Sequence, residues 1–324
     1  MGDTVLMKLK EIYDLAVKKG MKSDPRGEDE VKKLLGKAKE EYESLEGTDK
    51  EVFDMQRLEN PYADSRILHG DKATEIGSVM IGVNIDTGEV VLADRLNEKG
   101  KKVDLIIGHH PRGKSLSGLH DVMHLQKDVL INWGVPTVVA DSLMDKRIKE
   151  VERKVKGSNY NQSLDAAKLL DIPMMSIHTP TDNLVSDYLS KKVEDNDFEK
   201  VGDVLELLKE IPEYHESRKY GDGPFILVGD KDRRPGKVVV EMTGGTEGSK
   251  KSYEKLADAG VGTIIGMHLS DKHRKEVKEN HLNYIIAGHM ASDSIGINLF
   301  ADELERNGVE IIPCSGFVRH SRNS

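Results

Sequence analysis

The stretch DLIIGHHP, residues 104–111, joins a short apolar strand to two adjacent histidines. The carboxyl end of a strand in an α/β sheet is where ligands are usually bound. Neighbouring strand residues point to opposite faces, so His109 and His110 can serve one site only if the chain turns there. Gly108 and Pro111 favour such a turn. An isolated pair of histidines is weak evidence for metal binding, so support has to come from other segments.

This strand belongs to an alternating series of apolar strands and helical patterns, which is typical of an α/β fold. In the first part of the chain we also predict strands at 79–83 (VMIGV), 135–140 (VPTVVA) and 174–177 (MMSI). In the last third we predict strands at 238–242, 262–265, 284–287 and 309–312. Helices are expected between them, including two over residues 141–171 that are joined at 157–159, and more over 186–220.

These patterns divide the chain into three regions. Residues 1–60 are helical in pattern and highly charged, with Val31 and Leu35 at helical spacing, and are expected to be an N-terminal extension that packs or docks. Residues 61–185 are predicted to form a first α/β lobe. Residues 186–324 are predicted to form a helical connection and a second α/β lobe. The expected fold is therefore α/β, with mixed sheets flanked by helices in two lobes.

The composition excludes several classes of protein. The 324 residues include 48 Lys and Arg against 57 Asp and Glu, a net charge of −9, so nucleic acid is not an expected partner. The single cysteine, Cys314, cannot form an intrachain disulfide or a thiolate cluster, which fits a reducing compartment. No window approaches eighteen consecutive apolar residues, and the amino terminus lacks the pattern of a signal peptide. We expect a cytoplasmic protein with no membrane partner.

Two further predicted strands end in groups that can bind metal. The segment SIHTPTDN, residues 176–183, brings His178 and Asp182 to a strand end, where we expect both to be exposed to the space above the sheet. Asp182 has an alternative role as a helix cap. The segment IIAGHMASD, residues 285–293, places His289 and Asp293 four residues apart, on one face of a predicted helix.

Three strand ends that each supply imidazole or carboxylate groups make coincidence less plausible than any one of them does. Hard or borderline divalent cations are held by such nitrogen and oxygen ligands. Carboxylates that bridge are a common way to hold two cations together. The sequence therefore predicts a metal site at the carboxyl ends of the strands.

In this set of motifs the chain resembles the Nif-three-like family, often labelled GTP cyclohydrolase I type 2 homologues. The family pattern has a strand ending in HHP, an HT-x-x-D loop and a late GH-x-x-x-E motif. The corresponding segments here are HHP at 109–111, HTPTD at 178–182 and GHMASD at 288–293. Flanking segments at 63–71, 81–91 and 244–249 are also similar, so the resemblance spans about residues 60–320.

The resemblance implies a dinuclear metal site in the cleft between two α/β lobes. It implies two divalent transition-metal ions (Zn, Mn or Fe) and a homo-oligomer, often a ring such as a hexamer. Carried over by motif, the metal ligands are His109, His110, Asp182, His289 and Asp293. Asp182 and Asp293 are the candidates that would bridge the two ions.

The chain departs from the family pattern at two positions. The family usually has Glu where Asp293 stands, so the carboxylate here is shorter by about 1.5 Å of reach. A family TGE segment is replaced by Gly266-Met267-His268, which puts an imidazole where an acid is usual. His268 is therefore a candidate catalytic residue, as a proton shuttle or an extra ligand, with an ordinary surface histidine as the alternative.

Other residues near the motifs are candidates for binding phosphate. Arg112 and Lys114 follow HHP, and the turn GGTEGS at 244–249 could bind an anion through free amides at a helix start. Such turns are also common in α/β proteins without any ligand. The candidate phosphate contacts are Arg112, Lys114, Gly244, Gly245 and Gly248.

His120 and His124 lie one helical turn apart behind HHP. They could line the site, but we favour a helix face that contacts solvent or a neighbouring subunit.

Three functions compete. The leading one is a metal-dependent hydrolase that acts on a phosphorylated or nucleotide-like small molecule, through phosphoester hydrolysis or ring opening of a purine nucleotide. The alternative is a non-catalytic metal-binding or regulatory oligomeric protein. A nucleotide-binding protein that uses GGTEGS alone ranks last, because the chain has neither a G-x-G-x-x-G motif nor a Walker lysine.

Overall fold

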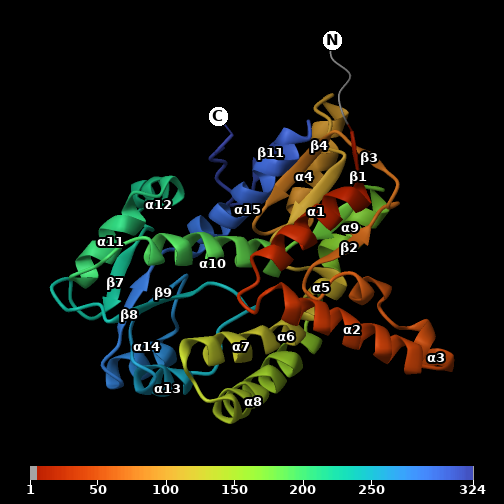
Figure 1. The fold of residues 1–324 in the computed structure, drawn as a ribbon. Coiled ribbons are helices and arrows are strands. Elements are labelled where there is room, and N and C mark those ends of the chain that lie inside the picture. Colours follow the sequence, from red (N-terminus) through yellow and green to blue (C-terminus); the bar gives the residue numbers. More distant parts are fainter. Residues whose placement is uncertain (1–5, 324) are drawn as a thin grey trace.

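Two mixed sheets organise residues 6–323, the part of the chain that the computed structural model describes (Figure 1). The five-stranded sheet has the order β11-β4-β5-β6-β2, in which only β2 is antiparallel to its neighbour. The four-stranded sheet has the order β7-β10-β9-β8, with β7 antiparallel to β10. The prediction of an α/β fold with mixed sheets flanked by helices is confirmed.

The strands are short, and most of them lie close to predicted positions, but β2 and β7 were not predicted. The five-stranded sheet contains β2 (Arg66–His69), β4 (Ser78–Gly82), β5 (Leu105–Gly108), β6 (Met174–Ser176) and β11 (Glu310–Cys314). The four-stranded sheet contains β7 (Phe225–Val228), β8 (Lys237–Glu241), β9 (Val261–Gly266) and β10 (Asn283–Ile286). A small additional pair is formed by β1 (Met7–Lys8) and β3 (Glu75–Ile76).

The helices fall into three stretches of the chain. The first stretch holds α1 (Leu9–Lys22), α2 (Glu28–Ser44), α3 (Gly47–Glu51) and α4 (Thr87–Glu98). The middle stretch holds α5 (Gly113–Ser117), α6 (Leu119–Val122), α7 (His124–Trp133), α8 (Thr137–Lys156), α9 (Gln162–Leu169), α10 (Thr179–Glu194), α11 (Val201–Lys209) and α12 (Pro212–Ser217). The last stretch holds α13 (Ser252–Asp258), α14 (Asp271–Glu279) and α15 (His289–Arg306).

Helices cover both faces of the five-stranded sheet, as an apolar, largely parallel sheet requires. On one face α1 and α15 pack against β4 and β5, through side chains that include Leu9, Ile12, Phe300, Val79 and Ile107. On the other face α4 and α9 pack through Val90 and Ala167 against Met80 and Ile106. The register that pairs Gly82 with Gly108, and Gly108 with Ser176, brings the ends of three strands to one edge.

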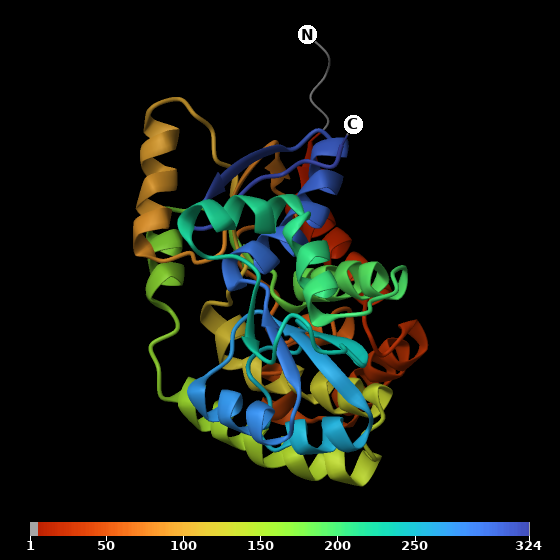
Figure 2. The ribbon, with the colours of Figure 1, turned by 90° about the vertical axis from the view of Figure 1, so that its left-hand side faces the viewer.

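The four-stranded sheet is also covered on both faces. Residues of α7 and α8 pack against β8 and β9, through side chains that include Leu130, Met144, Ile148, Val239 and Ile264. Figure 2 shows α8, in yellow-green, running beneath this sheet. On the other face α10 and α11 pack through Val185, Leu189 and Val204 against Val240 and Ile285. The core therefore joins segments from both halves of the chain.

The prediction of a strand at VPTVVA, residues 135–140, is wrong. These residues lead into α8, which begins at Thr137 with Pro136 at its N-cap. Two β-branched valines suggested a strand, but the buried residues that follow recur every three or four positions, at Ala140, Met144, Ile148, Val151 and Val155. The amphipathic helix outweighs the local strand propensity, and Val138 is left 80% exposed.

The expected boundaries between regions need correction at both ends. The helix α1 is part of the main core, because Leu9, Ile12 and Tyr13 are almost fully buried, so residues 1–60 are not only an appendage. At the other end, β11 pairs in parallel with β4, so the segment after α15 belongs to the five-stranded sheet. Residues 186–324 therefore do not form one separate lobe. The physical reason is that α15 begins beside the smaller sheet and delivers the chain to the larger one.

Among residues 6–323, the structure contains no helix that is long and apolar enough to span a membrane.

Candidate metal centre

His109 and His110 lie where the chain turns after β5, as the sequence predicted. The backbone amide of His109 donates to the Gly82 carbonyl (2.9 Å), and that of His110 donates to the Val83 carbonyl (2.8 Å). These bonds extend the contact with the neighbouring segment past the end of the strand. Both imidazoles consequently lie on the same side of the turn, with 5.2 Å between their ring centroids.

His178 and Asp182 lie at the start of α10. His178 occupies the N-cap position, and Asp182 lies one turn further along the helix. The alternative in which Asp182 caps the helix is therefore wrong. The expectation that both side chains are exposed is also wrong, because His178 is 6% and Asp182 5% exposed. They are buried because α10 packs between the two sheets instead of lying above one of them.

His289 and Asp293 lie in the first turns of α15. Gly288 precedes the helix with φ of 105°, a backbone conformation that favours glycine, and it allows the sharp change from β10 into the helix. The spacing of four residues places His289 Nε2 3.5 Å from Asp293 Oδ2. The prediction that the two side chains share one helical face is confirmed.

The three strand ends converge on Asp293. Its Oδ1 lies 3.4 Å from His109 Nε2, and its Oδ2 lies 3.5 Å from His110 Nε2. Asp293 is 1% exposed, so it occupies the interior of the cluster. The five residues predicted as ligands thus form one contiguous group.

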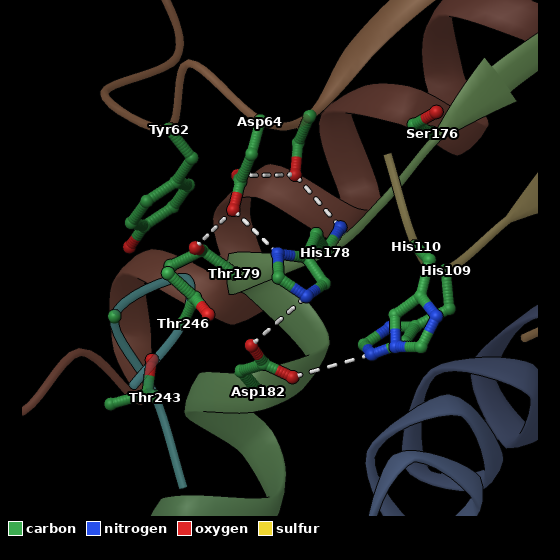
Figure 3. A network of polar contacts seen from close by, with 12 residues as sticks. Tyr62, Asp64, His109, His110, Ser176, His178, Thr179, Asp182, Thr243 and Thr246 are labelled. Atoms are coloured by element: carbon green, nitrogen blue, oxygen red, sulfur yellow. Dashed lines mark hydrogen bonds and ion pairs between the residues drawn. The ribbon is translucent and has the colours of Figure 1, made fainter. Parts of the chain in front are cut away.

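Asp182 makes a second set of contacts in the same cluster (Figure 3). Its Oδ1 lies 3.5 Å from His109 Nε2, and its Oδ2 lies 3.7 Å from His178 Nε2. His178, which was not among the predicted ligands, is therefore also part of the group. Its place in the HTPTD motif was the available sequence signal.

A second layer of hydrogen bonds fixes three of the imidazole rings. In each ring Nδ1 contacts a protein oxygen, while Nε2 points toward the carboxylates. The Nδ1 contacts are His109 to Thr181 Oγ1 (3.0 Å), His110 to Asn84 Oδ1 (2.8 Å) and His178 to Asp64 Oδ2 (2.8 Å). This arrangement is characteristic of histidines that ligate metals, because the outer hydrogen bond sets the tautomer and the ring orientation.

Asp64 was not predicted, although it lies in the flanking segment 63–71. It is fully buried, and its Oδ2 also accepts a hydrogen bond from Thr179 Oγ1 (2.6 Å), as Figure 3 shows. The contact with His178 spans 114 residues of sequence. No local spacing pattern could therefore have identified it.

The central carboxylates carry unsatisfied oxygens, which tests whether the group suits a metal. Within the described part of the chain, Asp182 Oδ1 and both oxygens of Asp293 are buried without a hydrogen-bond partner. An uncompensated buried carboxylate is costly, so such atoms require an explanation. Divalent transition metals accept carboxylate oxygens and imidazole nitrogens as ligands. Three sets of three residues in the described chain each offer such atoms within 4.8 Å of one another. The residues fit a metal centre.

Burial and nearby charges shift the pKa values of the clustered carboxylates and imidazoles in opposite directions. Burial raises the pKa of Asp182 to about 8, although His178 opposes the shift. Burial would lower the pKa of His178, but Asp182 and Asp64 outweigh it and raise that pKa to about 9. Burial opposes ionisation of Asp293 as well, yet His109 and its neighbours hold its pKa well below the usual range. Burial lowers the pKa of His289 to about 4, which leaves a neutral imidazole.

A cleft of about 320 Å³ opens beside the cluster and is lined by groups from both sheets. Of the candidate phosphate contacts, Arg112, Gly245 and Gly248 line this cleft. Lys114 and Gly244 are not among its lining residues in the described chain. Lys114 instead pairs with Asp54 at 3.1 Å.

The GGTEGS turn is not a helix start, because α13 begins only at Ser252. The expected anion site at a helix terminus is therefore not supported in that form. This turn is held by Gln126, whose side-chain amide donates to the carbonyls of Gly244 and Thr246 (both 2.6 Å).

His268 lines the cleft beside the cluster. Its ring lies 4.8 Å from that of His289, its side chain is 51% exposed, and its Nδ1 is 4.0 Å from Glu247 Oε1. His268 is thus close enough to contact a ligand. By contrast, His120 pairs with Asp121 and Glu152, and neither His120 nor His124 is among the residues that line this cleft.

No family model and no curated protein sequence matches the chain. Among solved structures, it is similar to the NIF3 superfamily protein from Sphaerobacter thermophilus, with 26% sequence identity and a TM-score of 0.72, over 88% of this chain and 98% of that one. Weaker likenesses are to reduced HcgD from Methanocaldococcus jannaschii (16% identity, TM-score 0.49, 86% and 97% of the two chains) and to the Bacillus cereus protein related to NIF3 (11%, 0.42, 90% and 98%). The likeness to the NIF3 superfamily protein from Sphaerobacter thermophilus agrees with the motifs that resemble the Nif-three-like family.

Proposed function

We propose that this protein is a dinuclear metal-binding protein that acts as a metal-dependent hydrolase on a phosphorylated or nucleotide-like small molecule. The proposed cofactors are two divalent transition-metal ions, Zn, Mn or Fe. The proposed ligands are the five predicted residues together with His178, namely His109, His110, His178, Asp182, His289 and Asp293.

Five of the six ligands fall into two groups that share one carboxylate, and His178 forms a third group with His109 and His110. The first contains His109, Asp182 and Asp293, and the second contains His110, His289 and Asp293. The two oxygens of Asp293 face different imidazoles, since Oδ1 faces His109 and Oδ2 faces His110 and His289. A carboxylate in this position suits a bridge between two cations.

The single observation that carries the proposal is the set of three buried carboxylate oxygens without partners among residues 6–323. Each faces an imidazole Nε2 atom at 3.4–3.5 Å, which is too long for a good hydrogen bond. Direct hydrogen bonding between these side chains therefore does not satisfy them. A cation between the donor atoms would do so.

A pair of divalent cations supplies Lewis acidity at a phosphoryl or ring-carbon centre and lowers the pKa of water. The residues of the chain would orient the imidazoles, exclude water from the buried side and hold negative charge near the cations. Arg112, which lines the cleft, pairs with Asp86 at 2.8 Å, and its guanidinium could also contact an anionic group of a substrate. His268, half-exposed beside His289, is the candidate for moving a proton.

Turnover of a phosphoester and of GTP tests the catalytic part of this proposal. Protein purified without a polyhistidine tag is loaded with Zn, Mn or Fe and assayed with p-nitrophenyl phosphate and with GTP. We expect hydrolysis that Asp293→Ala abolishes and the exposed control Asp165→Ala leaves unchanged.

Metal retention without any turnover of these substrates would favour the alternative, a non-catalytic metal-binding or regulatory protein. Equal turnover by Asp293→Ala and the wild type would show that the activity does not come from this site.

A further inference from the structure

A second polar group, centred on Glu241, lines the same cleft and has no part in the proposed metal chemistry. Glu241 ends β8, and the hydroxyls of two buried tyrosines face its carboxylate. Tyr284 Oη from β10 lies 3.3 Å from Glu241 Oε2, and Tyr253 Oη from α13 lies 3.5 Å from the same atom. Both tyrosines are 1% exposed, whereas Glu241 is only partly buried and lines the cleft.

The backbone leaves room for this arrangement at Gly266. A Cβ atom there would lie 1.9 Å from Tyr284 Oη, so any side chain at this position would displace the hydroxyl. The end of β9 is therefore compatible with Tyr284 contacting Glu241 only because residue 266 is a glycine.

The carboxylate of Glu241 lacks a compensating cation. Within residues 6–323, no Lys, Arg or His forms an ion pair with it. Burial raises its pKa to about 7, and the nearby Glu247 carboxylate acts in the same direction. Burying an ionised carboxylate without a cation costs free energy. A ligand that brings a positive charge or an N–H donor to Glu241 would offset part of that cost.

The two tyrosine hydroxyls supply only some of the hydrogen bonds that the Glu241 carboxylate can accept. The Tyr284 hydroxyl has one proton, yet it also lies 3.2 Å from the His268 carbonyl, so it cannot donate to both oxygens at once. Both tyrosine contacts involve Oε2, and Oε1 of Glu241 accepts no hydrogen bond from the described residues. One carboxylate oxygen is therefore available to the cleft.

Glu241 and the metal centre line one continuous cavity. The backbone of His268 contacts Tyr284, while its ring packs on that of His289. The lining of this cavity also includes the apolar side chains of Met242, Met267 and Leu269. Pockets that bind small molecules commonly combine such apolar walls with a few polar groups that fix orientation.

We infer that Glu241, positioned by Tyr253 and Tyr284, binds an N–H donor group, an amine or amidine edge, on a flat small molecule whose other end faces the metal centre. The second half of this inference rests on the proposed function. The binding role of Glu241 can be tested without turnover. It makes Glu241 a residue that selects the ligand, with the chemistry occurring at the other end of the cleft.

Benzamidine and benzoate are suitable probes because they share a flat ring and a similar shape but carry opposite charges. Each is titrated by calorimetry into zinc-loaded wild-type protein, Glu241→Gln and the exposed control Glu254→Gln, and the metal content of every sample is measured. We expect benzamidine to bind the wild type and the control, and Glu241→Gln to bind it at least about tenfold more weakly. Benzoate, whose carboxylate suits the zinc ions and not Glu241, should bind the wild type and Glu241→Gln equally. If Glu241→Gln fails to fold, Glu241→Asp replaces it and should weaken binding because its carboxylate is withdrawn.

Absence of benzamidine binding at millimolar concentration would overturn the inference, as would equal binding by the wild type and Glu241→Gln. A loss of benzoate affinity in Glu241→Gln as large as the loss of benzamidine affinity would also overturn it. A protein that holds no zinc but still binds benzamidine through Glu241 would instead contradict the proposed function while leaving the role of Glu241 intact.

Discussion

Asp64 supports the candidate centre without reaching its interior. Its carboxylate accepts hydrogen bonds from His178 Nδ1 and Thr179 Oγ1 and holds the start of α10 against the loop before β2. Partners of this kind orient a ligating histidine and increase its basicity. Asp64 is accordingly a positioning residue, and its contribution can be separated from that of a direct ligand.

We predict that Asp64→Asn lowers metal affinity by about 10–100-fold, the usual effect of losing an outer partner of a ligating histidine. The measurement is a competition titration against a chelator that binds zinc with known affinity. Asp165→Asn, on the exposed face of α9, is the matched control and should bind like the wild type. Unchanged affinity in Asp64→Asn would mean that His178 is not a ligand.

Glu241 gives a prediction about stability and pH. Burial raises its pKa from 4.5 to about 7 in the folded protein. The folded protein therefore favours the protonated side chain. Its contribution to the free energy of unfolding is complete below about pH 4.5 and is lost as the pH rises through about 7. Glu241→Gln removes this dependence, so the variant should gain stability relative to the wild type between about pH 5 and pH 8.

Thermal unfolding of both proteins across this pH range measures the difference, with Glu254→Gln as the control for loss of an exposed charge. A constant difference in melting temperature between the wild type and Glu241→Gln would show that the carboxylate is not perturbed.

At this scale, much of the cluster could be predicted from sequence. His109, His110 and Asp182 follow parallel strands, and such strand ends meet at one edge of a sheet. His289 and Asp293 were identified by their spacing. Glu241 and Asp64 could not be identified, because their partners Tyr284 and His178 are distant in sequence and only the tertiary fold brings them together.

The packing of α10 against α15 sets the distance between the two central carboxylates. Gly296 of α15 lies so close to α10 that an added Cβ would be 2.2 Å from the Thr181 carbonyl oxygen. Thr181 directly precedes Asp182. A larger residue at 296 would therefore push Asp182 and Asp293 apart.

We predict that Gly296→Ala destabilises the protein by about 1–3 kcal/mol, the usual cost of overpacking a tight contact, and reduces metal content. The matched control is Gly36→Ala in the exposed helix α2, where an added Cβ has nothing within 4 Å. That change should stabilise the protein by about 0.5–1 kcal/mol because alanine favours helix. Urea unfolding and elemental analysis of both variants provide the test. Wild-type stability and metal content in Gly296→Ala would show that the two helices tolerate separation.

At the scale of elements, the sequence predicted most of the strands but failed at VPTVVA. There the local preference of Val138 and Val139 for strand conflicted with the helical spacing of the buried residues after them. Tertiary packing decided the outcome, since α8 covers a face of the four-stranded sheet through Met144 and Ile148. Strand β7 was missed as well, and its short, partly exposed sequence gives little hydrophobic signal.

At the scale of the whole molecule, the chain crosses between the sheets more than once. The helices α7 and α8 cover the four-stranded sheet although they follow a strand of the five-stranded one, and β11 returns to the larger sheet at the end. A division of the sequence into consecutive lobes cannot anticipate such exchanges. The helix α15 packs in the cores of both sheets and carries Asp293 to His109 at the end of β5, which explains how residues 109 and 293 come together.

We also predict self-association, which the family resemblance implies. Light scattering coupled to size-exclusion chromatography should give a mass of at least two chains at micromolar concentration. A strictly monomeric mass would remove this prediction without affecting the metal centre.

The content of metal per chain tests the central claim most directly. It is measured by elemental analysis of untagged protein, after reloading with Zn, Mn or Fe, in the wild type, Asp293→Ala, Asp293→Asn and His268→Ala. We predict up to two ions in the wild type and in His268→Ala, because His268 lies outside the ligand groups found among residues 6–323. Both Asp293 variants should lose at least one ion, since removing the shared carboxylate leaves two cations with less compensation. Less than about a tenth of an ion per wild-type chain, or loss of metal in His268→Ala while Asp293→Ala keeps both ions, would contradict the account.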